Sequence, residues 1–247
     1  MVYIVAPSFP RDTAGGARPF TLRRNAMNLF SDSIGRKALM AVTGLLMVLF
    51  VVGHLLGNLT IFAGADGINA YAFHLHELAP VVWITRVVMG VAVVLHFVIS
   101  IQVTMENSKA KPDKYAVTRH LKATFASKYM IWTGVVLAVF IAYHLAQFTL
   151  RVTPDLVLQN DPQGRFDVFT MVATAFKGGL TAAAYVIAMV ALFLHLSHGI
   201  QSLFQTLGLS NGVMLPRYGM AGKVASVIFL VGFAAIPVAI FAGFVAA

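Results

Sequence analysis

Five histidines interrupt the apolar stretches of this sequence, and they are the side chains best suited to chemistry. They are His54, His96, His144, His195 and His198. Ionisable side chains inside a bilayer are rare and usually functional, and the neutral imidazole is the commonest metal ligand in proteins. Because four separate apolar stretches each carry at least one histidine, their pattern favours ligation over ordinary packing.

Depth along the apolar stretches sorts four of these histidines into two pairs. His54 lies about 16 residues, or roughly 24 Å of helix, into the first stretch, and His144 lies similarly late in the third. His96 and His195 lie late in the second and fourth stretches, which run in the opposite direction. We therefore expect an outer pair, His54 with His144, and an inner pair, His96 with His195.

Two imidazoles that face each other across a bundle core supply the two axial ligands of a haem iron. The sequence has no cysteine, which excludes disulfides, thiolate-held iron–sulfur clusters and Cys-based zinc sites in this chain. No carboxylate lies deep in the apolar stretches, so a zinc site or a proton-relay transporter is the weaker alternative. His198 competes with His195 for the inner site, but His195 lies deeper and matches His96 better.

The elements that position these histidines are five predicted membrane-spanning helices. Hydrophobic residues make up 59% of the 247 residues and charged residues only 11%, against about 25% charged in a soluble domain. A span needs about 20 apolar residues, and five stretches qualify. They run from Ala38 to Phe62, Pro80 to Thr104, Tyr129 to Leu150, Gly178 to Phe204 and Lys223 to Val245. The predicted fold is an all-α membrane protein with five transmembrane helices in a bundle.

Lys and Arg residues predict the orientation of this bundle. They gather before the first stretch and between the second and third, so the positive-inside rule places the N-terminus in the cytoplasm and the C-terminus outside. This distribution explains the net charge of +9 without nucleic acid. Residues 1–30 are expected to be a polar cytoplasmic extension, and 31–247 the five-helix dihaem domain.

In the long outer connection, Gly164–Phe176 is predicted to be a short interfacial helix with Phe166, Phe169 and Met171 against the membrane. No internal repeat is expected.

The order and spacing of several short motifs resemble a known family of respiratory subunits. The motifs are SIGRKALMAVTGLLMVLFVVGHLLGNL at 33–59, NAYAFHLHEL at 69–78, VVLHF at 93–97, YHLAQF at 143–148 and LHLSHGIQSLFQTLG at 194–208. With five spans and one histidine on each of the first four, the chain is similar to the single-subunit, dihaem cytochrome b membrane anchor of succinate dehydrogenase and fumarate reductase, the succinate:quinone oxidoreductases of complex II.

The resemblance implies two haem b groups. It assigns the distal haem to His54 and His144 and the proximal haem to His96 and His195. It also implies that the chain does not oxidise succinate itself. A cytoplasmic flavoprotein that holds FAD and an iron–sulfur subunit dock on the anchor, which passes electrons to or from a membrane quinone, expected to be menaquinone. The expected location is the bacterial inner membrane, in contact with lipid.

Quinone chemistry needs protons as well as electrons, and the sequence offers two places for it. By resemblance, Glu77 is the expected proton-transferring carboxylate near the distal haem, with His74 and His76 beside it. A rival site lies inside, where Ser33 and Arg36 could hydrogen-bond a quinone carbonyl or a propionate. From their positions, further cations are expected to pair with haem propionates. They are Arg86, Arg151 and Lys177 outside and Lys128 inside.

Two other functions stay open at this point. The chain could be a dihaem subunit of another quinone-linked dehydrogenase or reductase, such as a nitrate reductase or a hydrogenase. Nitrate-reductase-like anchors concentrate their ligands on two helices, whereas here they are spread over four. A haem-free transporter or channel is the alternative from a different class.

Overall fold

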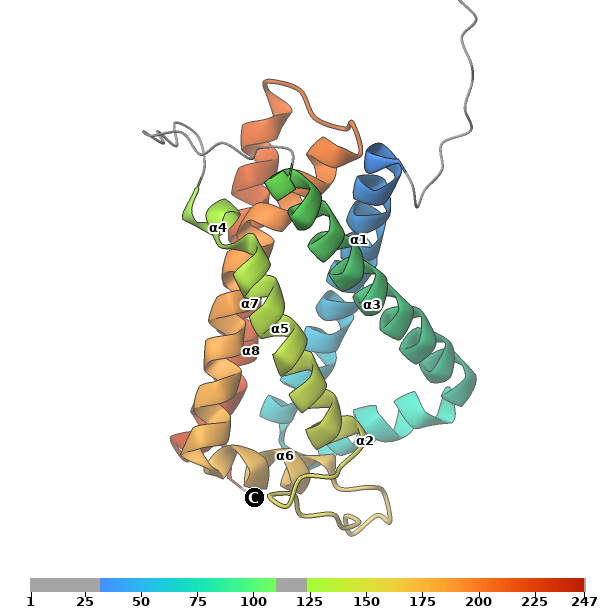
Figure 1. Ribbon diagram of the computed structural model, residues 1–247. Coiled ribbons are helices and arrows are strands. Elements are labelled where there is room, and N and C mark those ends of the chain that lie inside the picture. Colours follow the sequence, from blue (N-terminus) through green and yellow to red (C-terminus); the bar gives the residue numbers. More distant parts are fainter. Residues whose placement is uncertain (1–31, 110–123, 247) are drawn as a thin grey trace, which may run out of the picture.

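The computed structural model describes residues 32–109 and 124–246, and most of the chain in these ranges is helical (Figure 1). Its five long apolar segments confirm the predicted number of membrane-spanning helices. They are α1 (Ser33–Leu59), α3 (Ala79–Lys109), α5 (Met130–His144) with the π-helical turn Leu145–Thr149, α7 (Gly179–Thr206) and α8 (Met214–Phe241). The predicted extension 1–30 and most of the basic connection between the second and third spans lie outside the described residues.

The long helices pack as two adjacent pairs with α8 against the second. α1 packs mainly on α3, α5 on α7, and α7 on α8. Small residues allow the close approach of α7 and α8, as is usual for helices in lipid. A Cβ on Gly222 would lie 3.2 Å from Cβ of Ile200, and one on Gly232 would lie 2.9 Å from a methyl group of Leu55 on α1.

Two short helices close one end of the bundle, which we call the α6 end; the other is the Ser33 end. A 3₁₀ turn at Thr60–Ala63 leads from α1 into α2 (Gly64–Glu77), and α6 (Val168–Lys177) precedes α7. Both lie across the bundle, while the long helices run along it (Figure 1). A helix over Gly164–Phe176 was predicted, whereas α2 was not. The positive-inside rule predicts that the α6 end is the outer one.

The predicted contacts of α6 with the membrane are wrong. Phe169 is 8% exposed and Met171 is 3% exposed, and both belong to the core cluster beneath the α6 end. Phe166 packs against the same cluster. The reason is that the ends of the long helices leave apolar surface which α6 covers, so its apolar side faces protein.

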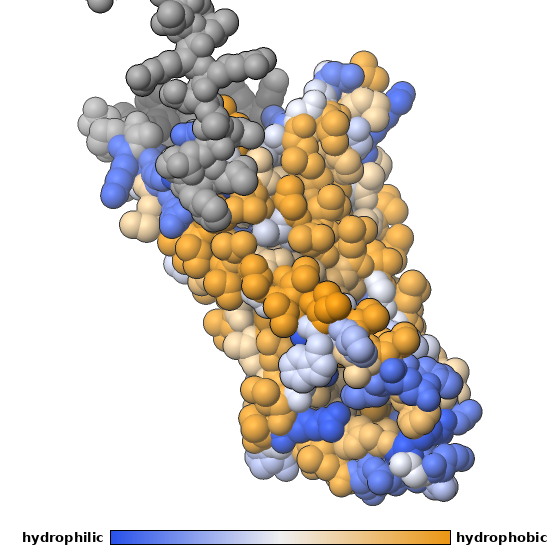
Figure 2. Space-filling model, turned by 90° about the vertical axis from the view of Figure 1, so that its right-hand side faces the viewer, coloured by the Kyte–Doolittle hydropathy of each residue, from blue (hydrophilic) through white to orange (hydrophobic). Residues whose placement is uncertain are grey.

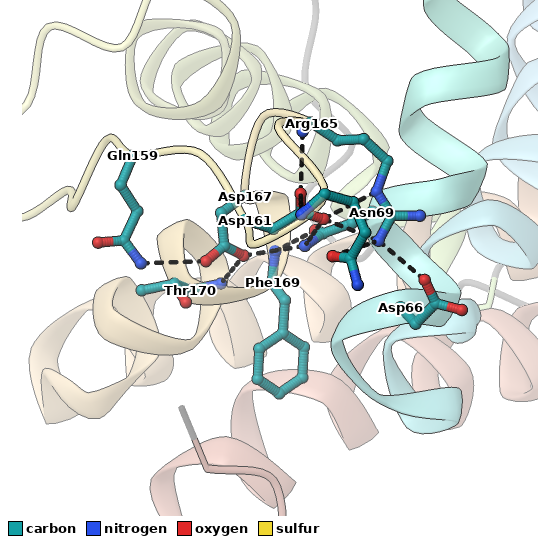
Figure 3. A network of polar contacts seen from close by, with 9 residues as sticks. Asp66, Asn69, Gln159, Asp161, Arg165, Asp167, Phe169 and Thr170 are labelled. Atoms are coloured by element: carbon teal, nitrogen blue, oxygen red, sulfur yellow. Dashed lines mark hydrogen bonds and ion pairs between the residues drawn. The ribbon is translucent and has the colours of Figure 1, made fainter.

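Buried polar groups fasten α6 to α2 (Figure 3). Asn69 of α2 is 1% exposed. Its amide nitrogen donates to Asp167 over 3.0 Å and to Asp161 over 3.4 Å, and its amide oxygen accepts from the backbone N–H of Phe169 over 2.9 Å. Asp167 also caps α6 by accepting from the backbone N–H of Thr170. The α6 end is therefore held by specific hydrogen bonds in addition to apolar packing.

An arginine completes this network at the surface. Arg165 forms ion pairs with Asp161 at 2.7 Å and with Asp66 of α2 at 2.8 Å (Figure 3). Burial raises the pKa of Asp161, but hydrogen bonds from Arg165 and its charge lower the pKa by more. Asp161 is therefore ionised at neutral pH and matches the positive charge beside it.

The surface of the bundle has the distribution expected for a membrane protein. One face shows a broad hydrophobic belt around its middle, with hydrophilic side chains gathered at the ends (Figure 2). Large apolar residues of α3 are exposed there or on neighbouring faces, including Trp83 at 62% and Ile84 at 64%. Exposed aromatic and aliphatic side chains of this kind are stable against lipid.

The last span begins earlier than predicted. The expected start was Lys223, whereas α8 begins at Met214. The side chain of Asn211 accepts hydrogen bonds from the backbone N–H groups of Val213 and Met214, and so caps the helix. Pro216 is tolerated because it falls in the first turn, where its missing N–H has no partner to lose.

Candidate functional site: two facing pairs of imidazoles

The four histidines lie in two pairs, each drawn from alternate long helices. His54 of α1 faces His144 of α5, with ring centroids 5.8 Å apart and planes at 87°. His96 of α3 faces His195 of α7, with centroids 6.3 Å apart and planes at 62°. The structure thus brings together the same partners that depth in the sequence predicted. All four imidazoles are partly shielded by the bundle.

The spacing within each pair suits two imidazoles that share one metal ion. With a metal–nitrogen bond of about 2 Å and roughly 1.1 Å from nitrogen to ring centre, trans imidazoles have centroids about 6 Å apart. No group of three or more His, Cys, Asp or Glu suited to a metal is found among the described residues. A metal held here would therefore take its other ligands from a cofactor, which fits a porphyrin and disfavours tetrahedral zinc.

Hydrogen bonds at the inner pair fix which nitrogen is free. Nδ1 of His96 lies 3.0 Å from the carbonyl oxygen of Met40. A carbonyl only accepts, so Nδ1 carries the proton and Nε2 keeps its lone pair. Nδ1 of His195 lies 3.1 Å from Oγ1 of Thr133, whose own proton is donated to the Met130 carbonyl. His195 therefore donates from Nδ1 as well, the arrangement usual for metal-ligating histidine.

His144 of the outer pair is held by a different kind of partner. Its Nδ1 lies 3.1 Å from the hydroxyl of Tyr185, which donates to the side-chain oxygen of Gln147 over 2.8 Å. Gln147 is fully buried in the π-helical turn, and its amide nitrogen donates to Asp155 over 2.7 Å. This chain, Tyr185–Gln147–Asp155, runs from His144 to the exposed loop at the α6 end.

The prediction that the sequence has no internal repeat is wrong, because α1–α3 and α5–α7 are two versions of one unit. Residues of the same type recur 90 positions apart around the same contacts. They are Met40 and Met130, Thr43 and Thr133, Gly44 and Gly134, Phe50 and Phe140, and His54 and His144. Phe50 stacks on His54 at 5.3 Å and Phe140 on His144 at 5.8 Å.

In each unit, a Thr-Gly dipeptide of the first helix contacts the histidine of the second: Thr43–Gly44 contacts His96, and Thr133–Gly134 contacts His195. Oγ1 of Thr43 lies 3.2 Å from Nδ1 of His96, as Thr133 does from His195. A Cβ on Gly44 would lie 3.3 Å from Cε1 of His96. The glycine therefore gives the imidazole room, and the threonine orients it.

Two cations at the α6 end of the bundle, Arg86 and Arg151, have no carboxylate partner within the described part of the chain. Burial, and secondarily the charge of Arg86, lowers the pKa of Arg151. The Arg151 guanidinium lies over the ring of Phe166 at 3.8 Å, and its Nε is buried without a hydrogen bond. Such an arrangement suits a carboxylate from a cofactor, such as a propionate.

The other predicted site residues lie apart from the imidazole pairs. Glu77 ends α2, and its carboxylate accepts a hydrogen bond from Nδ1 of His74 over 2.9 Å, with both side chains more than half exposed. His76 is exposed, and its Nδ1 donates to the carbonyl of Ala72. They were expected in an outer loop or at a span end, and the structure places them on α2.

At the Ser33 end, the rival pair of residues is only partly available. Ser33 is exposed at the start of α1. Arg36 forms an ion pair with Glu106 of α3 at 2.8 Å. Its guanidinium is thus already engaged by a carboxylate. His198, the alternative to His195, is partly buried and forms no ring pair with His96 among the described contacts.

These features define a multi-pass membrane protein with two facing pairs of imidazoles at two levels of a helical bundle. Residues 106–239 match the family described as the succinate dehydrogenase/fumarate reductase transmembrane subunit, so the chain belongs to that family. It is therefore a membrane subunit of that oxidoreductase complex. Neither a curated protein nor a solved structure matches the chain.

Proposed function

We propose that the chain is a dihaem cytochrome b anchor that carries electrons between an iron–sulfur subunit and a membrane quinone. The observation that carries this proposal is the pair of facing imidazole couples, 5.8 and 6.3 Å between ring centroids, at two levels of the bundle. A haem b at each level supplies one-electron redox chemistry. His54 and His144 hold the outer haem, and His96 and His195 hold the inner one.

The residues around each pair of histidines orient the imidazoles, balance charge and exclude water. Nδ1 of three of the ligands donates a hydrogen bond, from His96 to the Met40 carbonyl and Thr43, from His195 to Thr133 and from His144 to Tyr185. Nε2 of each is thereby left free to bind iron. Arg86 and Arg151 compensate negative charge at the outer level. The apolar helix walls exclude water, which keeps both levels in a low-dielectric environment.

The partners follow from family membership and from the charge distribution. The Ser33 end faces the cytoplasm, where the iron–sulfur subunit docks and carries the FAD-containing flavoprotein with it. The membrane is the bacterial inner membrane, and the quinone is menaquinone. No part of this function requires nucleic acid.

Glu77 is the proposed proton-transferring group of the quinone site. It lies at the α6 end of the molecule, is exposed to solvent and shares a hydrogen bond with His74. A carboxylate with access to water can exchange the protons that quinone chemistry takes up or releases. Ser33 at the opposite end is the rival position, whereas Arg36 is tied to Glu106.

Visible spectroscopy of single-ligand variants tests the haem proposal. The purified wild-type complex is expected to contain two b haems per chain. His96→Ala is expected to lose the inner haem and keep the outer, and His54→Ala to do the reverse. His198→Ala is the matched control, since it removes an imidazole one turn from His195 and should keep both haems. A wild-type protein without b-type absorption, or an unchanged haem content in His96→Ala, would overturn the proposal.

A further inference from the structure

The hydrogen bonds of the chain Tyr185–Gln147–Asp155 have a single possible direction. Burial raises the pKa of Asp155, but hydrogen bonds from neighbouring donors, Gln147 among them, lower it by more, so the carboxyl is ionised. A carboxylate only accepts, so the Gln147 amide nitrogen faces it and the Gln147 oxygen faces Tyr185. Tyr185 then donates to that oxygen and accepts from Nδ1 of His144. Every donor points toward the negative charge.

A chain of this kind changes the electronic character of the ligand at its origin. Hydrogen bonds in series polarise one another in a low-dielectric interior. A metal-ligating imidazole whose second nitrogen donates to an anion, or to a chain that ends on one, becomes a stronger electron donor. Greater donation favours the oxidised state of a bound iron and lowers its reduction potential.

Within residues 32–109 and 124–246, the other three imidazoles of the two pairs have no such link to a charged group. His96 donates to the carbonyl of Met40, and His195 pairs with the hydroxyl of Thr133. Among the described residues, His54 makes no side-chain hydrogen bond. The residue at the position of Tyr185 in the first unit, 99 positions earlier, is Arg86. It is exposed and lies over the ring of Trp83 at 5.1 Å.

We propose that Tyr185, Gln147 and Asp155 are positioning residues that lower the reduction potential of the outer centre by polarising His144. This inference rests on the proposed haem function. The burial of Gln147 supports it, because a fully buried amide that spends both ends on this chain has no other visible role. The π-helical turn that holds Gln147 is consistent with it, since such turns are frequent at functional sites.

Potentiometric titration of the intact complex, followed in the visible spectrum, tests this inference. Asp155→Asn removes the charge but keeps a group of the same shape at an exposed position. This substitution is expected to raise the equilibrium constant for reduction of the outer haem about tenfold, which is a rise of about 59 mV in its reduction potential for one electron. Tyr185→Phe and Gln147→Leu are expected to shift the same haem in the same direction, while the inner haem keeps its potential.

Two matched controls separate this effect from general ones. Asp66→Asn removes a carboxylate at the same end of the bundle, where it binds Arg165 and has no path to a ligand, and it should leave both potentials unchanged. Thr133→Val should affect the inner haem alone. If both haems are bound but Asp155→Asn and Tyr185→Phe leave the outer potential unchanged, the inference is wrong and the haem proposal stands. If the wild type has no haem, the proposed function itself fails.

Discussion

Replacing Asn69 by alanine is expected to open the cover that α6 forms over the bundle. Asn69 is 1% exposed and bonds to Asp161, Asp167 and the backbone N–H of Phe169. The substitution leaves the Phe169 N–H and one side of the Asp167 carboxylate buried without this partner. At about 1–3 kcal/mol for each of these two groups, the α6 end loses about 2–6 kcal/mol of stability. The equilibrium for local opening then rises roughly 30-fold or more, at about 1.4 kcal/mol per factor of ten.

Hydrogen exchange of the α6 amides, Val168–Lys177, in detergent or nanodiscs measures this opening directly. Asp66→Ala is the control, because it removes an ion pair of the same network whose carboxylate is 82% exposed, and exposed pairs contribute only about 0–1 kcal/mol. Faster exchange confined to α6 in Asn69→Ala, with little change in Asp66→Ala, is the expected result. Equal effects of both substitutions would refute the argument from burial.

Three further predictions concern single interactions at the two levels and at the α6 end. Thr133→Val removes a hydrogen-bond partner of His195 and is expected to perturb the low-spin electron paramagnetic resonance signal of the inner haem while sparing the outer. Arg151→Gln is expected to lower the content of outer haem in pyridine haemochrome assays, because the guanidinium beside Arg86 has no carboxylate partner in the described chain. Burial raises the pKa of Asp167, but its hydrogen bonds outweigh this and lower it from 3.8 to about 2. The stability it contributes is therefore complete above about pH 4 and lost toward pH 2, and α6 exchange should accelerate only in that window.

The pairing of histidines could be predicted from sequence because hydropathy places each of the four histidine-bearing spans along the membrane normal to within about a turn or two. Depth follows from that placement, and residues at equal depth on different helices can meet. Hydropathy does not predict the rotation of each helix about its own axis, that is, which of its sides faces the bundle. Lipid is as apolar as the interior of the bundle, so a lipid-facing side differs little from a buried one. Only the structure shows that His96 faces His195 and that Trp83 faces outward.

The contacts that support the ligands were missed for a related reason. Thr43, Gln147 and Tyr185 are polar or amphipathic residues inside spans, and their positions 11, 3 and 10 residues from a paired histidine on the same helix offered a signal. Each one, however, acts on a residue that it reaches only after folding: Tyr185 binds His144 from another helix. Likewise, the inward face of α6 depends on Asn69, about 100 residues away in sequence.

The repeated unit explains why the paired histidines come from alternate helices and why the two levels differ. Each unit carries one histidine toward each end, on α1 and α3 or on α5 and α7. When two such units face each other, equivalent histidines meet, so one arrangement creates both pairs. Differences between the levels must then arise where the units diverge. Tyr185 in the place of Arg86 is such a divergence, and it links one ligand of one level to a carboxylate at the surface. If each pair holds a haem as proposed, an electron moving between the faces of the membrane is expected to meet two centres of similar ligation and unequal potential.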